Sequence, residues 1–350
     1  MKIKQYKSIS FAILAAALYG ISSPVSKILL KEIPSTLMAS FLYLGAGLGM
    51  SIVGFIKHKK SKEKTEARLT KEELPFTTFM VLLDIVAPIF LMIGLSMTTA
   101  SNASLLNNFE IVATSLIALL IFKESISKRL WGAIALITVS SIILSVEDIS
   151  SFSFSFGSIF VLLACICWGL ENNCTRKLSV KDPLEIVVIK GFGSGISSLL
   201  IALALGEQTN NIPYIIAALL LGFFAYGLSI FFYIYAQRDL GAARTSAYYA
   251  IAPFIGVGLS LMIFREMPTF SFVIALVIMI IGTYFASTEQ HNHSHSHTVI
   301  THEHSHSHDE DHHNHIHDKT IMGKHNHRHT REEYSHSHKH SQDIHHSHAH

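Results

Sequence analysis

The chain has 350 residues, of which 49% are hydrophobic and 15% are charged, and its mean hydropathy is +0.38. This composition is too apolar for a soluble globular protein of that length. The net charge of +2 divides into −4 for residues 288–350 and +6 for the rest. Because the positive excess lies in short loops, it suggests membrane orientation and not nucleic-acid binding.

Long apolar runs follow one another from residue 9 to residue 287, and a helix that crosses a bilayer needs about 20 such residues. The candidate spans are 9–30, 35–56, 75–97, 101–122, 129–147, 156–175, 183–205, 212–236, 242–264 and 268–287. The first run is too long for a signal peptide and no small-residue cleavage site follows it. The sequence predicts an all-α membrane protein with ten transmembrane helices.

Positively charged loops predict the orientation, because Lys and Arg accumulate on the cytosolic side. Five basic segments fall on one side under a single assignment: Lys2, Lys4 and Lys7; residues 57–71; Lys128 and Arg129; Arg176, Lys177 and Lys181; Arg238 and Arg244. We therefore expect a multi-pass protein of the plasma (cytoplasmic) membrane with both termini in the cytosol.

Asp84 is an acidic residue within the predicted span 75–97, four residues before Pro88. A charge near the bilayer centre costs about 2.5–3.5 kcal/mol on insertion scales, so such residues usually face a cavity or a partner. The proline removes a backbone hydrogen bond near residue 84 and favours a kink. Asp84 is a candidate pathway residue, and a satisfied structural acid is the alternative.

Glu110 lies near the middle of span 101–122. On a continuous helix, Asn107 at i−3 and Thr114 at i+4 share its face and form a polar stripe. We predict that these residues belong to the pathway of a substrate or coupling ion, with Glu110 as a proton or cation site. The alternative is a neutral, hydrogen-bonded glutamate that fixes helix packing.

Glu171 lies in span 156–175 and is followed by Asn172 and Asn173, which we also place on the pathway. Glu171 could pair with Arg176, or with a basic residue on another helix, and form a polar gate. Cys167 at i−4 and Cys174 at i+3 offer a second possibility, which is ligation of a soft metal ion. The alternative for both cysteines is a small apolar residue in a buried helix.

An internal repeat divides the apolar part of the chain into residues 9–147 and 156–287. Residues 98–124 align with 240–266 at a constant offset of 142, and both blocks end alike, in IFKE and IFRE. A second match pairs Tyr19-Gly20 with Trp168-Gly169. Five helices in each half force the second half to enter the membrane from the opposite side, so the sequence predicts an inverted repeat.

The tail, residues 288–350, is polar and contains 22 of the 23 histidines. It lacks the apolar residues needed to build a core, so we expect it to be disordered. Neutral imidazole is a good ligand for Zn²⁺, Ni²⁺, Co²⁺ and Cu²⁺. The candidate ligands are His291, His293, His295, His297, His302, His304, His306, His308, His312, His313, His315 and His317.

The two five-helix halves, the matched aromatic-glycine pairs and the segment LGAARTSAYYAIAPFIGVGLSLMIFRE (240–266) resemble the EamA family of the drug/metabolite transporter superfamily. The resemblance covers residues 9–287 and does not extend to the tail. It implies a ten-helix inverted-repeat fold with a central cavity and alternating access without ATP. The chain departs from the family pattern in its first half, where Glu110 and Ile111 stand at the positions that Ala252 and Pro253 occupy in the second.

The sequence has no nucleotide-binding loop, HExxH motif or catalytic triad signature, and we expect neither an enzyme nor a required cofactor. The main hypothesis is a secondary active transporter, an exporter of a small solute coupled to protons or cations. The first alternative is an exporter of divalent Ni, Co or Zn ions whose tail collects metal in the cytosol. The second is a membrane-anchored metal store or sensor. The expected partners are the lipid bilayer, the solute and a second copy of the chain in a homodimer.

Overall fold

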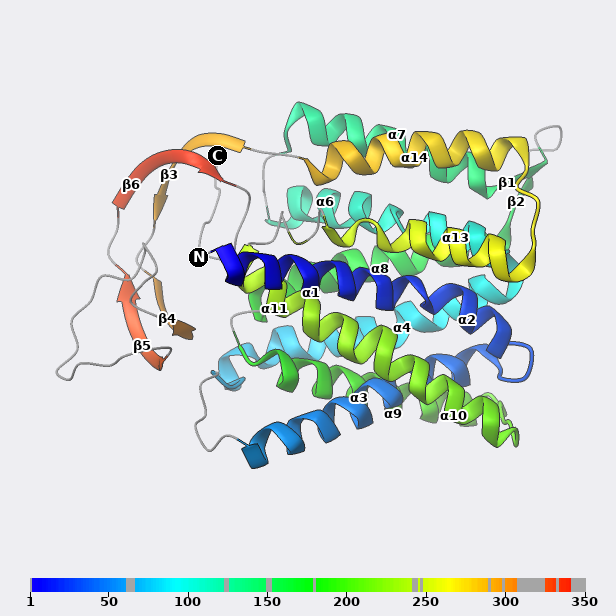
Figure 1. Ribbon diagram of the computed structural model, residues 1–350, viewed down its shortest axis with the longest axis horizontal. Coiled ribbons are helices and arrows are strands. Elements are labelled where there is room, and N and C mark those ends of the chain that lie inside the picture. The colour runs from blue at the N-terminus through cyan, green and yellow to red at the C-terminus, as the bar shows by residue number, and fades with distance from the viewer. Residues whose placement is uncertain are drawn as a thin grey trace.

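A computed structural model describes residues 2–60, 67–122, 126–148, 153–178, 181–240, 245, 248–288, 291–297, 300–306, 325–331 and 334–340. Helices make up most of the described residues that precede the tail (Figure 1). In chain order they are α1 (Lys2–Gly20), α2 (Ser22–Leu29), α3 (Ser35–Lys60), η1 (Lys71–Glu73), α4 (Leu74–Met97), α5 (Ala100–Leu106), α6 (Phe109–Phe122), α7 (Lys128–Ser145), α8 (Phe156–Leu178), α9 (Pro183–Ala204), α10 (Ile212–Leu221), η2 (Gly222–Leu228), α11 (Ser229–Leu240), α13 (Ala252–Phe264) and α14 (Phe270–Ser287).

Nine helical segments among the described residues are long and apolar enough to cross a bilayer. They are Tyr6–Leu29, Ser35–Lys57, Lys71–Met97, Ala100–Ile121, Lys128–Ser145, Phe156–Thr175, Pro183–Ala204, Ile212–Gln237 and Phe270–Ser287. The predicted span 242–264 is represented by the shorter apolar helix α13, and residues 241–244 and 246–247 lie outside the described part. The chain is thus a multi-pass helical membrane protein.

One of these spans, Lys71–Met97, begins with the 3-10 turn η1, and three others are interrupted within their length. The span predicted over 101–122 is divided into α5 and α6 by a turn at Asn107 and Asn108. Asn108 donates its side-chain Nδ2 to the Leu105 carbonyl at 3.1 Å, and such local bonds compete with helix formation. The eighth span contains the π-helical segment η2 between α10 and α11, and the first is interrupted between α1 and α2.

Small residues bring α3 and α9 into close contact. A methyl group placed on Gly47 would lie 3.1 Å from the backbone carbonyl carbon of Gly191, which leaves little room for a side chain there. In lipid, where apolar burial gives no driving force between helices, such close backbone packing supplies much of the attraction. Gly47 and Gly191 therefore serve close packing of α3 against α9.

Short strands occur at two places. A small antiparallel pair, β1 (Val146–Asp148) and β2 (Ser153–Phe154), follows α7. In the tail, β3 (His291–His297) pairs with β6 (Tyr334–His340), and β4 (Ile300–His306) pairs with β5 (His325–Arg331). Each tail strand pairs with another part of the tail, and the residues between them lie outside the described part, so the predicted disorder of residues 288–350 stays a prediction.

Candidate functional site

A cavity of about 130 Å³ lies inside the helix bundle. Its walls come from helices of both halves of the chain, including α1, α3, α4, α6, α8, α9, η2 and α11. The lining residues are Tyr19, Tyr43, Asp84, Glu110, Trp168, Glu171, Asn172, Thr175, Lys190, Tyr226, Ile230, Tyr233, Ile234 and Tyr249. A cavity that is lined by charged and aromatic side chains in an otherwise apolar bundle is a candidate binding site.

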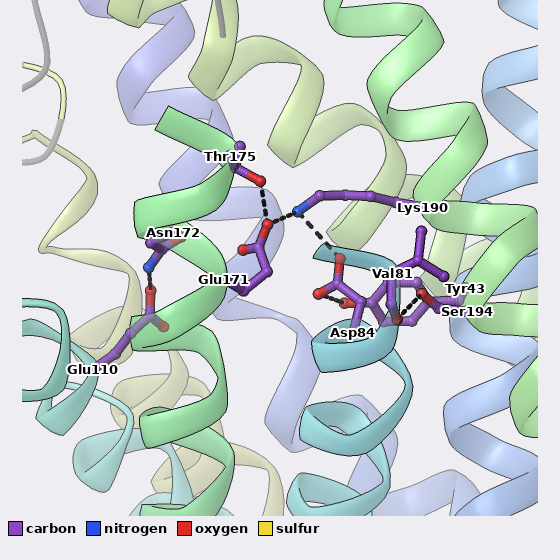
Figure 2. A network of polar contacts seen from close by, with 9 residues as sticks. All are labelled: Tyr43, Val81, Asp84, Glu110, Glu171, Asn172, Thr175, Lys190 and Ser194. Atoms are coloured by element: carbon purple, nitrogen blue, oxygen red, sulfur yellow. Dashed lines mark hydrogen bonds and ion pairs between the residues drawn. The ribbon is translucent and has the colours of Figure 1, made fainter. Parts of the chain in front are cut away.

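Lys190 joins two of the acidic residues (Figure 2). Its Nζ lies 2.5 Å from Glu171 Oε1 and 3.2 Å from Asp84 Oδ2. Glu171 also accepts a hydrogen bond from the Thr175 hydroxyl one helical turn later, and Asp84 Oδ1 accepts one from the Tyr43 hydroxyl at 2.9 Å. These contacts connect α3, α4, α8 and α9 through one buried network.

Glu110 is held differently. Asn172 on α8 donates its Nδ2 to Glu110 Oε1 at 2.6 Å. Figure 2 shows that Glu171 and Asn172, although adjacent on α8, point to different partners. Within the described part of the chain, no Lys or Arg side chain forms an ion pair with Glu110. Glu110 therefore has an amide donor where Glu171 has a cation.

Among the described residues, the charged groups that line the cavity do not balance. Asp84, Glu110 and Glu171 together with Lys190 place three carboxylates beside one ammonium group. The side chains of Asp84 and Lys190 are 1% and 5% exposed, so water compensates them poorly. When all four groups are ionised, the site carries an excess of negative charge that a proton or another cation would neutralise.

Four of the residues predicted for the pathway line this cavity: Asp84, Glu110, Glu171 and Asn172. The other three do not. Asn173 is buried and donates to the carbonyl oxygens of Gly169 and Thr114, and Asn107 is buried at the turn between α5 and α6. The predicted polar stripe of Asn107, Glu110 and Thr114 requires an unbroken helix. The turn at residues 107–108 interrupts the helix, so Asn107 does not share a helical face with Glu110.

Lys190 and the aromatic residues of the cavity were not predicted from the sequence. Lys190 carried a usable signal, since it is a charged residue eight positions into the apolar span Pro183–Ala204. The tyrosines gave little signal in the sequence, because aromatic residues are common in apolar helices. The prediction that Glu171 pairs with a basic residue on another helix is met by Lys190, and the side chain of Arg176 lies outside the described part.

Metal ligation was the second possibility for Glu171. Among the described residues, no group of three His, Cys, Asp or Glu side chains is placed to hold a metal ion. Cys167 and Cys174 are not among the residues that line the cavity. The twelve tail histidines named as ligands cannot be placed in the same way, because their side chains lie outside the described part, so the tail site stays a prediction.

Comparisons with known proteins agree with this architecture. A sequence model of the EamA-like transporter family matches residues 6–146 and again residues 155–288. An "Uncharacterized transporter" of Methanothermobacter thermautotrophicus is 28% identical over 292 residues, which are 78% of this chain and 83% of the relative. The "Uncharacterized transporter YyaM" of Bacillus subtilis is 26% identical over 209 residues, 56% of this chain and 67% of the relative.

A solved crystal structure shares the fold with a TM-score of 0.55 at 13% sequence identity, and the match covers 81% of this chain and 95% of that one. At this identity the likeness concerns the fold alone. The two family matches together span most of the chain, from α1 to the end of α14. The chain belongs to the EamA-like transporter family and is a membrane transporter.

Proposed function

We propose that this transporter is a secondary active exporter of a small solute, works by alternating access and is coupled to protons or cations. The observation that carries the proposal is the excess of carboxylates over cations among the described residues that line a cavity between membrane-spanning helices. A negatively charged site of this kind is stable in the membrane when a cation or proton occupies it, which links occupancy to the conformation of the helices.

Glu110 is the group we assign to coupling. It faces the cavity, is held in place by Asn172, and has no cationic partner among the described side chains, whereas Lys190 provides one for Glu171 and Asp84. A proton on Glu110 removes a charge without requiring another side chain to move. Protonated and ionised Glu110 would then favour different openings of the bundle. The Lys190 network would keep its own helices together throughout.

We further propose that residues 9–147 and 156–287 are two inverted five-helix repeats. Tyr19 and Trp168, which the sequence alignment pairs, both line the cavity. Corresponding positions of two repeats are expected to meet at a shared central site, since the repeat axis passes through it. The separate matches of the family model to residues 6–146 and 155–288 support the same division.

The glycines that follow these aromatic residues support the repeat independently. A methyl group on Gly20 would lie 2.9 Å from the Ile255 side chain, and one on Gly169 would lie 2.8 Å from the Ala113 side chain. Ala113 and Ile255 are themselves separated by the offset of 142 that aligns the two halves. The two close helix contacts therefore correspond under the proposed symmetry.

Ten crossings fit the positions of the chain ends. The start of α1 and the end of α14 lie at the same end of the bundle (Figure 1). Each crossing changes the side of the membrane, so a shared side requires an even number of spans. One further crossing that includes α13, between the spans Ile212–Gln237 and Phe270–Ser287, brings the nine long segments to ten. With the basic loops inside, both termini are proposed to lie in the cytosol of a cell bounded by this membrane.

The position of the cavity favours loading from the cytosol. Thr175 immediately precedes Arg176 and Lys177, two basic residues that we place inside, and Ile234 lies four residues before Arg238, which we also place inside. Both line the cavity, so it reaches toward that side.

The opposite side is tied by polar contacts. Lys27 donates its Nζ to the carbonyl oxygens of Leu95 and Thr98 at 2.6 and 2.7 Å, and Ser101 donates to Glu266 at 2.8 Å. A cation at the C-terminal end of a helix such as α4 also has favourable dipole electrostatics. This arrangement corresponds to a cytosol-facing state, from which an exporter takes up its solute.

The test is a transport assay in liposomes that contain the purified protein and a trapped pH-sensitive dye, with and without Na⁺. Amino acids, amines, nucleosides, sugars and divalent Ni, Co and Zn ions are each added outside. We expect at least one solute to move protons with the wild-type protein and to lose that effect with Glu110→Gln. Undiminished coupled transport by the Glu110→Gln variant would refute the role of Glu110.

The alternative is an exporter of divalent Ni, Co or Zn ions, and the observation that favours it is the histidine content of residues 288–350. In that case deletion of the tail alters metal tolerance of cells, and loss of the whole protein alters it further. Unchanged tolerance after loss of the whole protein would exclude this function. A store or sensor that transports nothing predicts instead that the tail tethered to an unrelated helix reproduces the tolerance, and it leaves the buried carboxylates without a role.

A further inference from the structure

Aromatic rings make up a large part of the cavity wall. Tyr19, Tyr43, Trp168, Tyr226, Tyr233 and Tyr249 all line it. They come from α1, α3, α8, η2, α11 and the segment before α13, so residues far apart in the chain gather there. Aromatic side chains scattered through ten apolar helices have no reason to collect at the charged cavity in particular.

The tyrosines form a continuous series of ring contacts. The ring centroids of Tyr43 and Tyr226 are 5.4 Å apart, those of Tyr226 and Tyr19 are 5.9 Å, those of Tyr19 and Tyr249 are 5.9 Å, and those of Tyr249 and Tyr233 are 4.9 Å. These separations are those of packed aromatic pairs, so each ring restrains its neighbour. The result is a preformed aromatic surface next to the carboxylates.

The carboxylates retain unused capacity for a ligand. Asp84 Oδ2 is buried and accepts no hydrogen bond from the described residues, although Lys190 Nζ lies 3.2 Å away as an ion-pair partner. Glu110 accepts its hydrogen bond from Asn172 at Oε1, and among the described side chains no cation neutralises it. Glu110 is thus available to a positive charge, and Asp84 Oδ2 can still accept a hydrogen bond.

These features discriminate between ligand classes. An anion would meet three carboxylates and one ammonium group, so the net field repels it. A polyhydroxylated neutral solute would need many polar partners, and much of this wall is aromatic. A bare divalent metal ion prefers a group of several oxygen, nitrogen or sulfur ligands, and the described acidic residues form no such group. An organic cation is attracted both by the carboxylates and by the faces of aromatic rings.

Resting on the proposed transport function, we propose that the solute recognised in this cavity is a small organic cation, an alkylammonium or aryl-alkylammonium compound. The carboxylate of Glu110 attracts its charge, Asp84 Oδ2 can accept a hydrogen bond from it, and the surface that includes Tyr19 and Trp168 packs against its carbon groups. The ionic part gives preference for a cation over a neutral molecule of the same shape. The aromatic part gives preference for an alkylated cation over a bare inorganic ion.

Binding can be followed through Trp168. The chain has two tryptophans, and Trp131 is 48% exposed on α7 away from the cavity, so Trp131→Phe leaves Trp168 as the single reporter. The variant in lipid nanodiscs is titrated with two matched pairs, choline against 3,3-dimethylbutan-1-ol and benzylamine against benzyl alcohol. Glycine betaine and benzoate test a zwitterion and an anion.

We expect saturable changes in Trp168 fluorescence with choline or benzylamine, and binding of its neutral counterpart that is weaker by about tenfold or more. Glu110→Gln should reduce this preference for the cation without weakening the neutral compound. Tyr19→Phe keeps the ring and should retain cation binding, whereas Tyr19→Leu should weaken it by about tenfold. A melting curve for each variant shows that a loss of binding does not reflect unfolding.

The proposal is overturned if neither cation changes the fluorescence, if the neutral or anionic compounds bind as tightly, or if Tyr19→Leu, folded, binds cations like Tyr19→Phe. The transport assay separates this failure from failure of the proposed function. If an amino acid or a neutral metabolite moves protons in liposomes and the organic cations do not, coupled transport stands and the organic-cation class is wrong. If choline or benzylamine binds and yet no solute moves protons, proton coupling fails and the organic-cation site stands.

Discussion

Two adjacent residues of α8, Glu171 and Asn172, take part in contacts of opposite kinds with the charged groups of the same cavity. Glu171 is bound to Lys190 from α9, which also contacts Asp84 on α4, so its charge is compensated by a neighbouring helix. Asn172 instead donates an amide hydrogen bond to Glu110 on α6, which holds the carboxylate in place, and no cation among the described side chains pairs with it. A compensated acid suits a fixed contact between helices, and an uncompensated one suits reversible binding of a proton or cation.

The largest effect on stability should come from breaking the ion pairs that Lys190 makes with Asp84 and Glu171. Lys190→Met removes the cation and leaves Asp84 and Glu171 buried together, and loss of one partner of a buried ion pair destabilises by about 3–5 kcal/mol. We expect a clearly lower melting temperature in detergent. The triple variant Asp84→Asn, Glu171→Gln, Lys190→Met removes all three charges and should recover much of the stability. If Lys190→Met melts like the wild type, the network does not hold these helices together.

Substitution of Glu110 should change transport and leave the stability of the fold nearly unchanged. Glu110→Gln keeps the shape of the side chain and an oxygen that can accept from Asn172, so unfolding should change by about 1 kcal/mol or less. Solute-driven proton flux should fall by about tenfold or more, which corresponds to about 1.4 kcal/mol. Glu110→Asp retains an ionisable group and serves as the matched control. A variant that is unstable but fully coupled would reverse the assignment of the two acids.

A smaller effect is expected on the aromatic side of the cavity. Ser22 donates its hydroxyl to the Tyr226 hydroxyl at 3.1 Å, and Tyr226 belongs to the π-helical segment η2. Tyr226→Phe should cost about 0.5–1.5 kcal/mol while leaving the ring in place for a ligand. Ser22→Ala should have a similar cost, and the double variant should cost less than the sum because both remove the same bond. Additive costs would indicate that the bond contributes nothing.

The smallest effect on the cavity should follow from removing the tail. Deletion of residues 288–350 should leave the melting temperature and the solute-driven proton flux of the helical part unchanged, because the family match ends at residue 288. Calorimetric titration should show Zn²⁺ and Ni²⁺ binding to the full chain and a large loss of binding after deletion. A loss of proton flux on deletion would connect the tail to transport and favour the metal-export alternative.

Much of this protein is determined by its sequence alone. Apolar runs long enough to span a bilayer fix the helices, and the rule that charges are costly in a membrane identifies Asp84, Glu110 and Glu171 without a structure. The same rule applied to residues 183–205 would have identified Lys190. These signals are local, because they depend on what one segment contains and not on its neighbours.

The partners of these residues were decided only by the tertiary structure. Successive side chains on a helix point about 100° apart, so Asn172 reaches Glu110 in the cavity while Asn173 turns back to the Gly169 carbonyl. The turn at residues 107–108 likewise sets Glu110 apart from the stripe that an unbroken helix would have made. The depth of an acidic residue in the membrane follows from its position along its own span. The contact that gives a buried acid its role depends instead on which other helix packs against it.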